Sequence, residues 1–396
     1  MSDKPTVKLR PKIDPRPLRR GAPWVYANQL VTDRRTKALA PGTIAVLEDN
    51  AHLPIGTVTI NPVSKIIARM LDVDPAAEID ADWMRTRVRQ ALALRETLYN
   101  APFYRLIHAE ADGFPGTVVD RFGDTLVIQP NAAWIDARLD VFAEVLTEVT
   151  GANTILKNAQ GRARALEGLD DVSAVLAGTM SGTVEVPMNG AIYMADLETG
   201  QKTGLFYDQR PNHAFVAEVS RGLRVLDVFS HVGGFALAAL ANGASEAVAV
   251  DGSKAALNLA RRSAEASQVA DRFETRKGDA FDVLSELNGA SEQFGSVVCD
   301  PPAFAPSKQA LEAGLRAYEK VARQASHLVA PGGYLTLCSC SQAAQIDAFR
   351  KACLRGIGRA GRQAQLLRTG YAGPDHPMHP ALEESGYLKA LTFRLL

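Results

Sequence analysis

The fold is decided by the stretch Val225-Leu226-Asp227-Val228-Phe229-Ser230-His231-Val232-Gly233-Gly234-Phe235. Its first half is a short apolar run typical of a buried strand, and its second half is a turn with two glycines that opens an apolar helical stretch. From about residue 190 onward, further strand and helix patterns alternate, which indicates a doubly wound parallel sheet of the α/β class. The carboxyl ends of such strands share one crevice, so we expect the ligand site there.

Acidic side chains follow three successive strands of this expected sheet, namely Asp227, Asp251 and Asp279. At such positions carboxylates accept hydrogen bonds from ribose hydroxyls or an adenine edge. The Gly-x-Gly-x-x-Gly loop of a dinucleotide site is absent, which favours S-adenosylmethionine, a nucleoside without phosphate. A non-binding domain with these residues as turn formers stays the alternative. The predicted cofactor-binding residues are Lys202, Tyr207, Gln209, Arg210, Asp227, Phe229, Ser230, Gly233, Gly234, Phe235, Asp251, Gly252, Ser253, Asp279, Ala280, Asp300 and Pro301.

Four of these residues lie upstream, in the polar and glycine-rich segment 200–211. Pro211 fits the first turn of a helix that follows this segment. We expect the segment to help close the cofactor site, and a plain linker between domains is the alternative.

The motif Asp300-Pro301-Pro302-Ala303-Phe304 ends the fourth expected strand. Its prolines remove N–H donors and stiffen the loop, and Phe304 offers an apolar face on which a flipped base can stack. Asp300 can then bond the polar edge of that base. Pro302 and Phe304 are therefore predicted to bind substrate, although the motif alone could also be a loop stop.

Cys340, between Ser339 and Ser341, ends the fifth expected strand. Carbon 5 of a pyrimidine is a poor nucleophile, so its methylation requires a thiolate to add first to carbon 6. Cys340 is the predicted nucleophile and Asp300 its catalytic partner, with a buried structural cysteine as the alternative. The other cysteines, 299, 338 and 353, fit packing roles, and no second pair stands at metal-ligand spacing, so we expect no metal.

The chain has a formal net charge of zero, which hides a basic N-terminus. Residues 1–40 hold ten Lys or Arg against three Asp, a surplus of seven positive charges that suits phosphate neutralisation. Arg16, Arg19 and Arg20 are the predicted phosphate contacts, and a merely solvated basic arm is the alternative.

Composition and segment patterns bound the rest. With 46% hydrophobic and 22% charged residues over 396 positions, we expect a soluble globular protein of several domains. No apolar run is long enough for a membrane span or secretion signal, so a cytoplasmic location without membrane contact is expected. Closely spaced short strands predict a small all-β barrel or sandwich over residues 1–75. A central α+β domain is predicted over residues 76–188, with a helix over 80–99, strands at 104–108, 116–121 and 125–129, and a helix over 134–149. Residues 189–396 form the α/β domain.

At these residues the chain resembles a known family, the PUA-domain ribosomal RNA large-subunit methyltransferases that act on carbon 5 of a cytosine in 23S ribosomal RNA. Besides the strand-end motifs, residues 104–116, 120–124, 200–210, 375–377 and 387–389 carry the resemblance. It implies a PUA barrel that binds RNA, a Rossmann-like class I methyltransferase sheet, S-adenosylmethionine as cofactor, Cys340 as nucleophile and Asp300 as the acid that holds the base. Ala303 stands where the wider cytosine-C5 group carries a second cysteine, so another group must remove the carbon 5 proton.

We therefore expect an S-adenosylmethionine-dependent RNA methyltransferase that makes 5-methylcytosine in 23S ribosomal RNA. Two alternatives stay open. One is an enzyme that methylates a base nitrogen, with Cys340 structural, and the other is a non-catalytic RNA-binding module. A homodimer is possible, and the sequence does not decide it.

Overall fold

The computed structural model describes residues 4–180, 182–198 and 204–396. These residues fall into two compact units, and each is described by itself. The first comprises Met1–Gly182, Leu197–Gly204 and Pro374–Glu383, and the second comprises Thr183–Asp196, Leu205–Gly373 and Glu384–Leu396.

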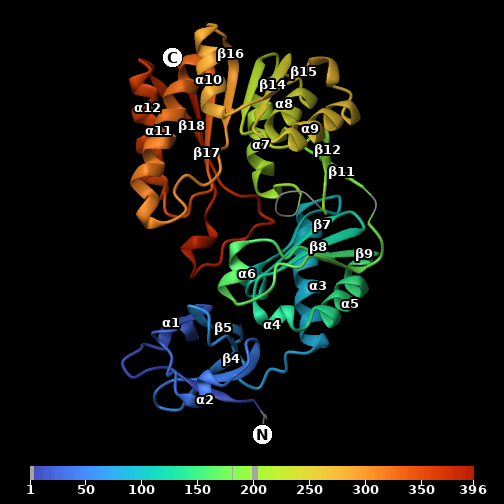
Figure 1. Ribbon diagram of the computed structural model, residues 1–396, viewed down its shortest axis with the longest axis vertical. Helices are drawn as coiled ribbons and strands as arrows, with labels where there is room; N and C mark the ends of the chain where they lie inside the picture. Colours follow the sequence, from blue (N-terminus) through green and yellow to red (C-terminus); the bar gives the residue numbers. More distant parts are fainter. Residues whose placement is uncertain (1–3, 181, 199–203) are drawn as a thin grey trace. The chain divides into compact units, whose positions relative to one another are not determined.

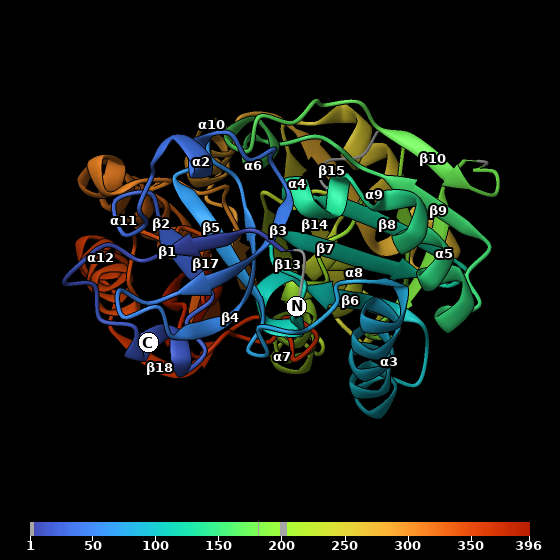
Figure 2. The same cartoon turned by 90° about the horizontal axis from the view of Figure 1, so that it is seen from below.

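The first unit opens with a five-stranded sheet in the order β1-β3-β4-β5-β2. Antiparallel pairing of β3, β4 and β5 surrounds an apolar cluster that includes Val58, Ile60 and Ile67. The strands and their two short helices gather into one compact body, drawn in blue in Figures 1 and 2. This agrees with the small all-β domain, a barrel or sandwich, expected from the short β-branched runs, and the single sheet favours the barrel. Its elements are β1 (Thr6–Lys8), α1 (Arg16–Arg19), β2 (Trp24–Tyr26), α2 (Arg34–Lys37), β3 (Thr43–Glu48), β4 (Pro54–Ile60) and β5 (Ile66–Asp72).

A second five-stranded sheet follows, in the order β10-β9-β8-β7-β6, with helices α3 and α5 packed against each other beside it. The α3 helix begins where expected, because the Asp80 carboxylate accepts a hydrogen bond from the Trp83 N–H at 2.9 Å. The single helix expected over 134–149 is instead two helices, because residues 137–138 are not helical and interrupt it. The elements are α3 (Ala81–Leu98), β6 (Phe103–His108), β7 (Thr117–Phe122), β8 (Thr125–Pro130), α4 (Ala133–Asp136), α5 (Leu139–Thr150), β9 (Thr154–Lys157), α6 (Arg162–Leu166) and β10 (Ala174–Ala177).

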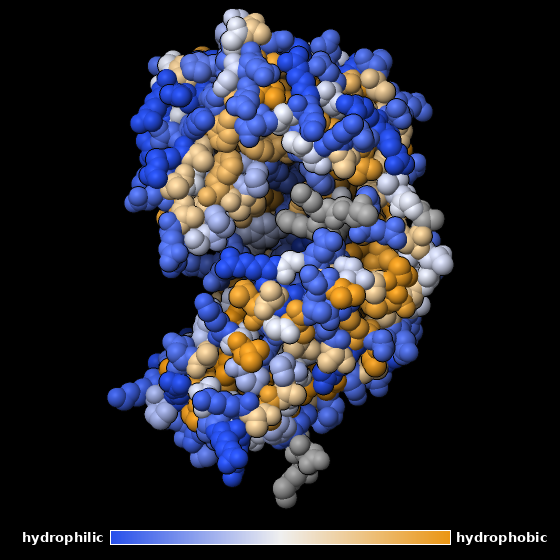
Figure 3. Space-filling model, viewed as in Figure 1, coloured by the Kyte–Doolittle hydropathy of each residue, from blue (hydrophilic) through white to orange (hydrophobic). Residues whose placement is uncertain are grey.

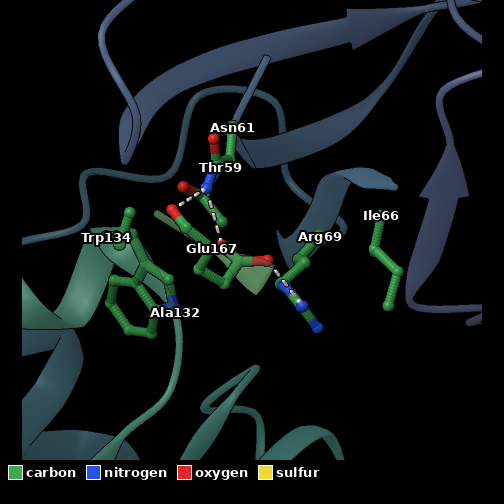
Figure 4. A pocket seen from close by; sticks show the side chains of 8 residues that line it. Thr59, Asn61, Ile66, Arg69, Ala132, Trp134 and Glu167 are labelled. Atoms are coloured by element: carbon green, nitrogen blue, oxygen red, sulfur yellow. Dashed lines mark hydrogen bonds and ion pairs between the residues drawn. The ribbon is translucent and has the colours of Figure 1, made fainter. Parts of the chain in front are cut away.

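A buried polar cluster joins the barrel to this second sheet (Figure 4). The Glu167 carboxylate accepts hydrogen bonds from Asn61 Nδ2 at 2.8 Å and Ser64 Oγ at 2.7 Å, and pairs with Arg69 at 3.0 Å. Arg69 also pairs with Glu110 at 3.1 Å, so one guanidinium bridges two acids of the central region. These charge-assisted bonds fix the barrel to the central sheet.

The second unit carries a seven-stranded sheet in the order β15-β14-β13-β16-β17-β19-β18. Strands β13 to β17 pair in parallel, and the strand order reverses at β13, with β14 on one side of it and β16 on the other. The ligand crevice is expected at the carboxyl ends of β13 and β16, where the loops that follow these two strands diverge. Helices α10, α11 and α12 pack as one group, and α7 and α8 as another (Figure 1). The doubly wound sheet predicted from the alternating pattern is confirmed.

Two features of this unit escaped the sequence patterns. The last two strands, β18 and β19, run antiparallel to each other, with β19 also antiparallel to β17, and a hairpin of β11 and β12 precedes the sheet. The elements are β11 (Val184–Met188), β12 (Ala191–Ala195), α7 (Arg210–Val219), β13 (Arg224–Val228), α8 (Gly234–Ala241), β14 (Glu246–Asp251), α9 (Lys254–Ala266), β15 (Phe273–Lys277), α10 (Ala280–Gly289), β16 (Phe294–Cys299), α11 (Leu311–Leu328), β17 (Val329–Ser339), α12 (Ile346–Arg359), β18 (Ala364–Gly370) and β19 (Lys389–Leu395).

Candidate active site

A tight turn joins β13 to α8 at the carboxyl edge of the sheet. Phe229, His231 and Gly233 all have positive φ, at 62°, 50° and 81°. Two of these are not glycines, and such strained backbone is concentrated at functional sites. The Ser230 N–H donates to Val250 O at 3.0 Å, which ties the turn to the neighbouring strand. The first N–H groups of α8 are bonded within the turn, because the Gly234 N–H donates to Ser230 O at 3.4 Å and the Ala236 N–H donates to Asp227 at 3.0 Å.

The Asp227 carboxylate lies under this turn and has no exposed surface. Its Oδ2 accepts a hydrogen bond from the Ala236 N–H at 3.0 Å, whereas Oδ1 has no partner among the described residues. Burial raises the pKa of Asp227 to about 7, and the neighbouring charge of Asp251 adds to that. A buried carboxylate with one oxygen unused is suited to a positively charged ligand group. Ser230 Oγ is likewise buried and unbonded among the described residues.

Gly234 is required by packing as well as by its place in the turn. A Cβ at this position would lie 2.7 Å from Cε1 of His213, a buried residue of α7. The Gly234 carbonyl accepts a hydrogen bond from the Tyr193 hydroxyl at 3.0 Å, and the ring of Phe235 meets the His213 ring edge-on. The start of α8 is thus held on both sides, which keeps its backbone close to the crevice.

Asp251 and Asp279 follow the next two strands, as predicted, and each also serves the local backbone. Asp251 accepts hydrogen bonds from the His231 N–H at 2.9 Å and the Ser253 N–H at 2.7 Å. Asp279 caps α10 by accepting from the Phe281 N–H at 2.9 Å. Gly252 is exposed beside them. The acids therefore lie at one edge of the sheet, and a turn-forming role accounts for part of their bonding.

The Asp300 motif follows β16 on the other side of β13. The Asp300 N–H donates to Val228 O at 3.1 Å, and its Oδ2 accepts from Gln209 Nε2 at 2.9 Å. The predicted segment before α7 and the predicted loop after β16 thus meet at these two residues. Tyr207, Gln209 and Arg210 all lie there, with the Arg210 guanidinium 5.3 Å from the Tyr207 ring centre. Lys202 lies outside the described residues.

Phe304 does not stand free at the end of this motif. Its ring packs against those of Phe229, Phe281 and Tyr318, at centroid distances of 6.2, 6.2 and 5.0 Å. Phe304 therefore has a packing role, and its stacking on a base stays a prediction. Pro302, by contrast, is exposed.

Cys340 follows the last residue of β17, and its flanking serines are buried and hydrogen-bonded. Ser339 Oγ donates to the Tyr318 hydroxyl at 2.9 Å, and that hydroxyl lies 2.8 Å from Ser341 Oγ. Ser341 Oγ also accepts from the Ala305 N–H at 3.0 Å, which joins this loop to the Asp300 motif. Cys340 is partly exposed, whereas the other three cysteines are buried, as their predicted packing roles require.

Five residues near the site were not among the predicted site residues, although two of them, Asp208 and Lys389, lie in segments that carry the family resemblance. Their partners come from distant parts of the chain, so no local pattern marks them. The Tyr387 hydroxyl donates to Asp208 Oδ2 at 2.6 Å, and Asn212 Nδ2 donates to Gln209 Oε1 at 2.7 Å. The five are Asp208, Asn212, His213, Tyr318 and Lys389.

The predicted phosphate contacts belong to the first unit. Arg16 pairs with Asp14 at 2.8 Å, and Arg19 pairs with Asp49 at 3.1 Å. Arg20 is exposed and makes no ion pair within 4 Å to any residue that the structure describes. The face of the barrel seen in Figure 3 carries mostly hydrophilic side chains. Among the described residues, no group of three acidic, histidine or cysteine side chains could hold a metal ion, and no helix there is long and apolar enough to cross a membrane.

Comparisons with known proteins bear on both units. A family described as S-adenosylmethionine-dependent methyltransferase matches residues 125–394, and a PUA-like domain matches residues 7–72. A ribosomal RNA large subunit methyltransferase of Deinococcus radiodurans is 32% identical over 100% of this chain and 98% of its own. Ribosomal RNA large subunit methyltransferase I of Aeromonas salmonicida is 35% identical over 84% of this chain and 85% of its own.

A solved structure from Streptococcus mutans, described as a candidate SAM-dependent methyltransferase, has the same fold. It superposes with a TM-score of 0.83 at 20% identity, covering 98% of this chain and 100% of its own. The expected combination of a PUA-like domain with a methyltransferase sheet is thereby confirmed.

Proposed function

This chain belongs to the S-adenosylmethionine-dependent ribosomal RNA large subunit methyltransferases, and we propose that it methylates carbon 5 of a cytosine in 23S ribosomal RNA through a covalent bond to Cys340. The observation that carries the proposal is the partly exposed Cys340 on a loop bonded to the Asp300 motif, beside the crevice at β13. The relatives, named as ribosomal RNA large subunit methyltransferases, support a large-subunit RNA substrate. Such a substrate fits action in the cytoplasm.

The residues at the β13 turn fit S-adenosylmethionine. When bound, this cofactor supplies an electrophilic methyl group on a sulfonium. Asp227 offers a buried carboxylate with one unbonded oxygen to a positive group, and the buried hydroxyl of Ser230 is a further polar group of the turn without a partner among the described residues. Asp251 and Asp279 offer acceptors to hydroxyl or amino groups from the adjoining strand ends. Gln209 and Asp300 together close the side toward the substrate.

In the proposed reaction, the Cys340 thiolate adds to carbon 6 of the cytosine and makes carbon 5 nucleophilic. Asp300 holds the polar edge of the base while this bond forms. After carbon 5 is methylated, its proton leaves to a base, the electron pair returns to the ring, and the carbon–sulfur bond breaks. The thiolate is thereby regenerated.

Two substitutions test this route. Cys340→Ala is expected to abolish methyl transfer from labelled cofactor to unmodified 23S ribosomal RNA. Cys353→Ala, at a buried position of α12, is expected to retain methyl transfer. With RNA that contains 5-azacytidine, the wild type is expected to form a denaturant-resistant protein–RNA adduct, and Cys340→Ala none.

The methylated nucleoside, identified by mass spectrometry, separates the alternatives. 5-Methylcytosine supports the proposal. A methyl group on a base nitrogen, together with full turnover by Cys340→Ala, would sink the covalent route and make Cys340 a structural residue. RNA binding without any cofactor binding in calorimetry would indicate the non-catalytic module.

A further inference from the structure

The Cys340 loop is bound by a buried cation from the end of the chain. Lys389 begins β19 and pairs across the sheet with Ser339, the residue before Cys340. Its Nζ donates a hydrogen bond to the carbonyl of Ser341, the residue after Cys340, at 2.7 Å. Lys389 is only 4% exposed. Burying an ammonium group costs free energy unless a hydrogen-bond acceptor or a negative charge compensates for the lost water.

Other polar groups of the loop have neutral partners among the described residues. The Tyr318 hydroxyl, from α11, bonds both flanking serines, and burial raises its pKa, so it stays protonated at neutral pH. Asp300, after β16, is bonded by Gln209, and Asp208 is bonded by Tyr387. Lys389 thus brings a positive charge to this loop through its hydrogen bond to Ser341 O.

The electrostatics of Lys389 point toward the thiol. Burial lowers the pKa of Lys389 to about 8, and the neighbouring Cys340 opposes part of that shift. Such coupling is reciprocal, because a charge that favours the ammonium is itself favoured by the ammonium. A lysine beside a cysteine is a known way to increase the thiolate fraction.

We propose that Lys389 is a positioning residue that fixes the Cys340 loop through Ser341 O and stabilises the Cys340 thiolate. Its catalytic consequence rests on the proposed covalent route, since only that route needs a thiolate. Its effect on the thiol is a property of the protein alone.

The test measures the rate at which iodoacetamide alkylates Cys340 as a function of pH, without RNA or cofactor. The three buried cysteines react slowly, and Cys340→Ala gives the background. Lys389→Gln removes the charge and keeps a donor for Ser341 O, Lys389→Met removes both, and Lys389→Arg keeps the charge. We expect the midpoint of alkylation to rise by about one pH unit in Lys389→Gln, which is about tenfold slower alkylation near pH 7. Lys389→Arg is expected to stay close to the wild type.

Two outcomes overturn the inference: an unchanged alkylation midpoint in Lys389→Gln, or an equal shift in Lys389→Arg. Thermal unfolding shows whether each variant folds. If Lys389→Met does not fold, the comparison of Lys389→Gln with Lys389→Arg tests the inference. The two proposals fail separately. If Lys389→Gln shifts the midpoint but no azacytidine adduct forms in the wild type, the covalent function fails and the role of Lys389 stands.

Discussion

Gln209 Nε2 donates a hydrogen bond to Asp300 Oδ2 at 2.9 Å, and Gln209 Oε1 accepts one from Asn212 Nδ2 at 2.7 Å. Gln209 thus sets the rotamer of Asp300 from the start of α7. If Asp300 holds the base as proposed, Gln209→Leu is expected to lower kcat by about 10- to 100-fold, because a carboxylate that loses an orienting hydrogen bond is misplaced. Steady-state methylation of RNA measures this, and the Kd for S-adenosylmethionine serves as a second readout. A kcat within twofold of the wild type would show that Asp300 is oriented by other groups.

Gly234→Ala is expected to disrupt the cofactor turn. The new Cβ would lie 2.7 Å from His213 Cε1, so the ring or the helix must move, at a cost of about 1–3 kcal/mol. Gly289→Ala is the matched control, since it also falls within a helix and its Cβ would meet no atom within 4 Å. Calorimetric Kd for the cofactor and chemical unfolding measure both effects.

A double variant tests whether the His213 ring is the cause of that destabilisation. If His213 is the obstacle, adding His213→Ala to Gly234→Ala should recover part of the lost stability, as a positive coupling in a double-mutant cycle. Additive losses would instead locate the strain in the backbone of the turn.

Much of the fold, and the positions of the predicted site residues at the strand ends, could be predicted from the sequence because they rest on local signals. Apolar runs, two glycines and strand-end acids marked β13, β14 and their turns. The antiparallel β18 and β19 were missed, because their pairing is set by contacts with β17 rather than by their own pattern. The same holds for Lys389, whose partner lies 48 positions away in the chain. The packing of Phe304 among three rings is likewise a tertiary property.

Asp227 makes stability depend on pH in a direction opposite to that of an ordinary paired acid. Its pKa rises from 3.8 to about 7 on folding, so the folded state binds its proton more tightly than the unfolded state. The stability of the cofactor-free protein should therefore fall as pH rises from about 4 to 7, on the order of 4 kcal/mol from this group, at about 1.4 kcal/mol per pKa unit. Asp227→Asn removes that contribution.

Urea unfolding of both proteins at pH 5 and pH 8 measures the effect. From pH 5 to pH 8, the free energy of unfolding should decrease more for the wild type than for Asp227→Asn. Saturating S-adenosylmethionine should reduce the difference at pH 8 by providing a positive partner for the carboxylate. Parallel pH profiles for the two proteins would contradict the raised pKa.

Arg95 is a fully buried charged residue of the first unit. Its fully buried guanidinium pairs with both oxygens of Asp112 at 2.7 Å and donates to the carbonyls of Arg105 and Asp375 at 2.9 Å. Arg95→Met leaves the Asp112 carboxylate without its ion pair, although it still accepts a hydrogen bond from the His108 N–H at 2.6 Å, and the cost is about 3–5 kcal/mol. Arg89→Met, on the exposed side of the same helix, is the control and should change stability by less than about 0.5 kcal/mol. Urea unfolding compares the two variants; equal losses would mean that Arg95 contributes only its aliphatic stem.

The basic residues of the barrel are expected to differ in their contribution to RNA binding. Arg19 donates to Asp49 and to the Pro54 carbonyl, so part of its role is to hold the turn between β3 and β4. Arg20, Arg34 and Arg35 are exposed and make no ion pair within 4 Å to a residue that the structure describes. Their charges can therefore neutralise phosphate without breaking an existing pair, which is the condition for counterion release.

Replacing Arg20, Arg34 or Arg35 by Gln should weaken binding to a 23S ribosomal RNA fragment. Removing one Arg–phosphate pair should reduce the slope of log Kd against log salt by about 0.7 to 0.9. Arg16→Gln should have a smaller effect, because Asp14 already neutralises that charge. Filter binding between about 50 and 300 mM salt measures the slopes. Equal slopes for all four variants and the wild type would place the RNA-binding surface elsewhere on the chain.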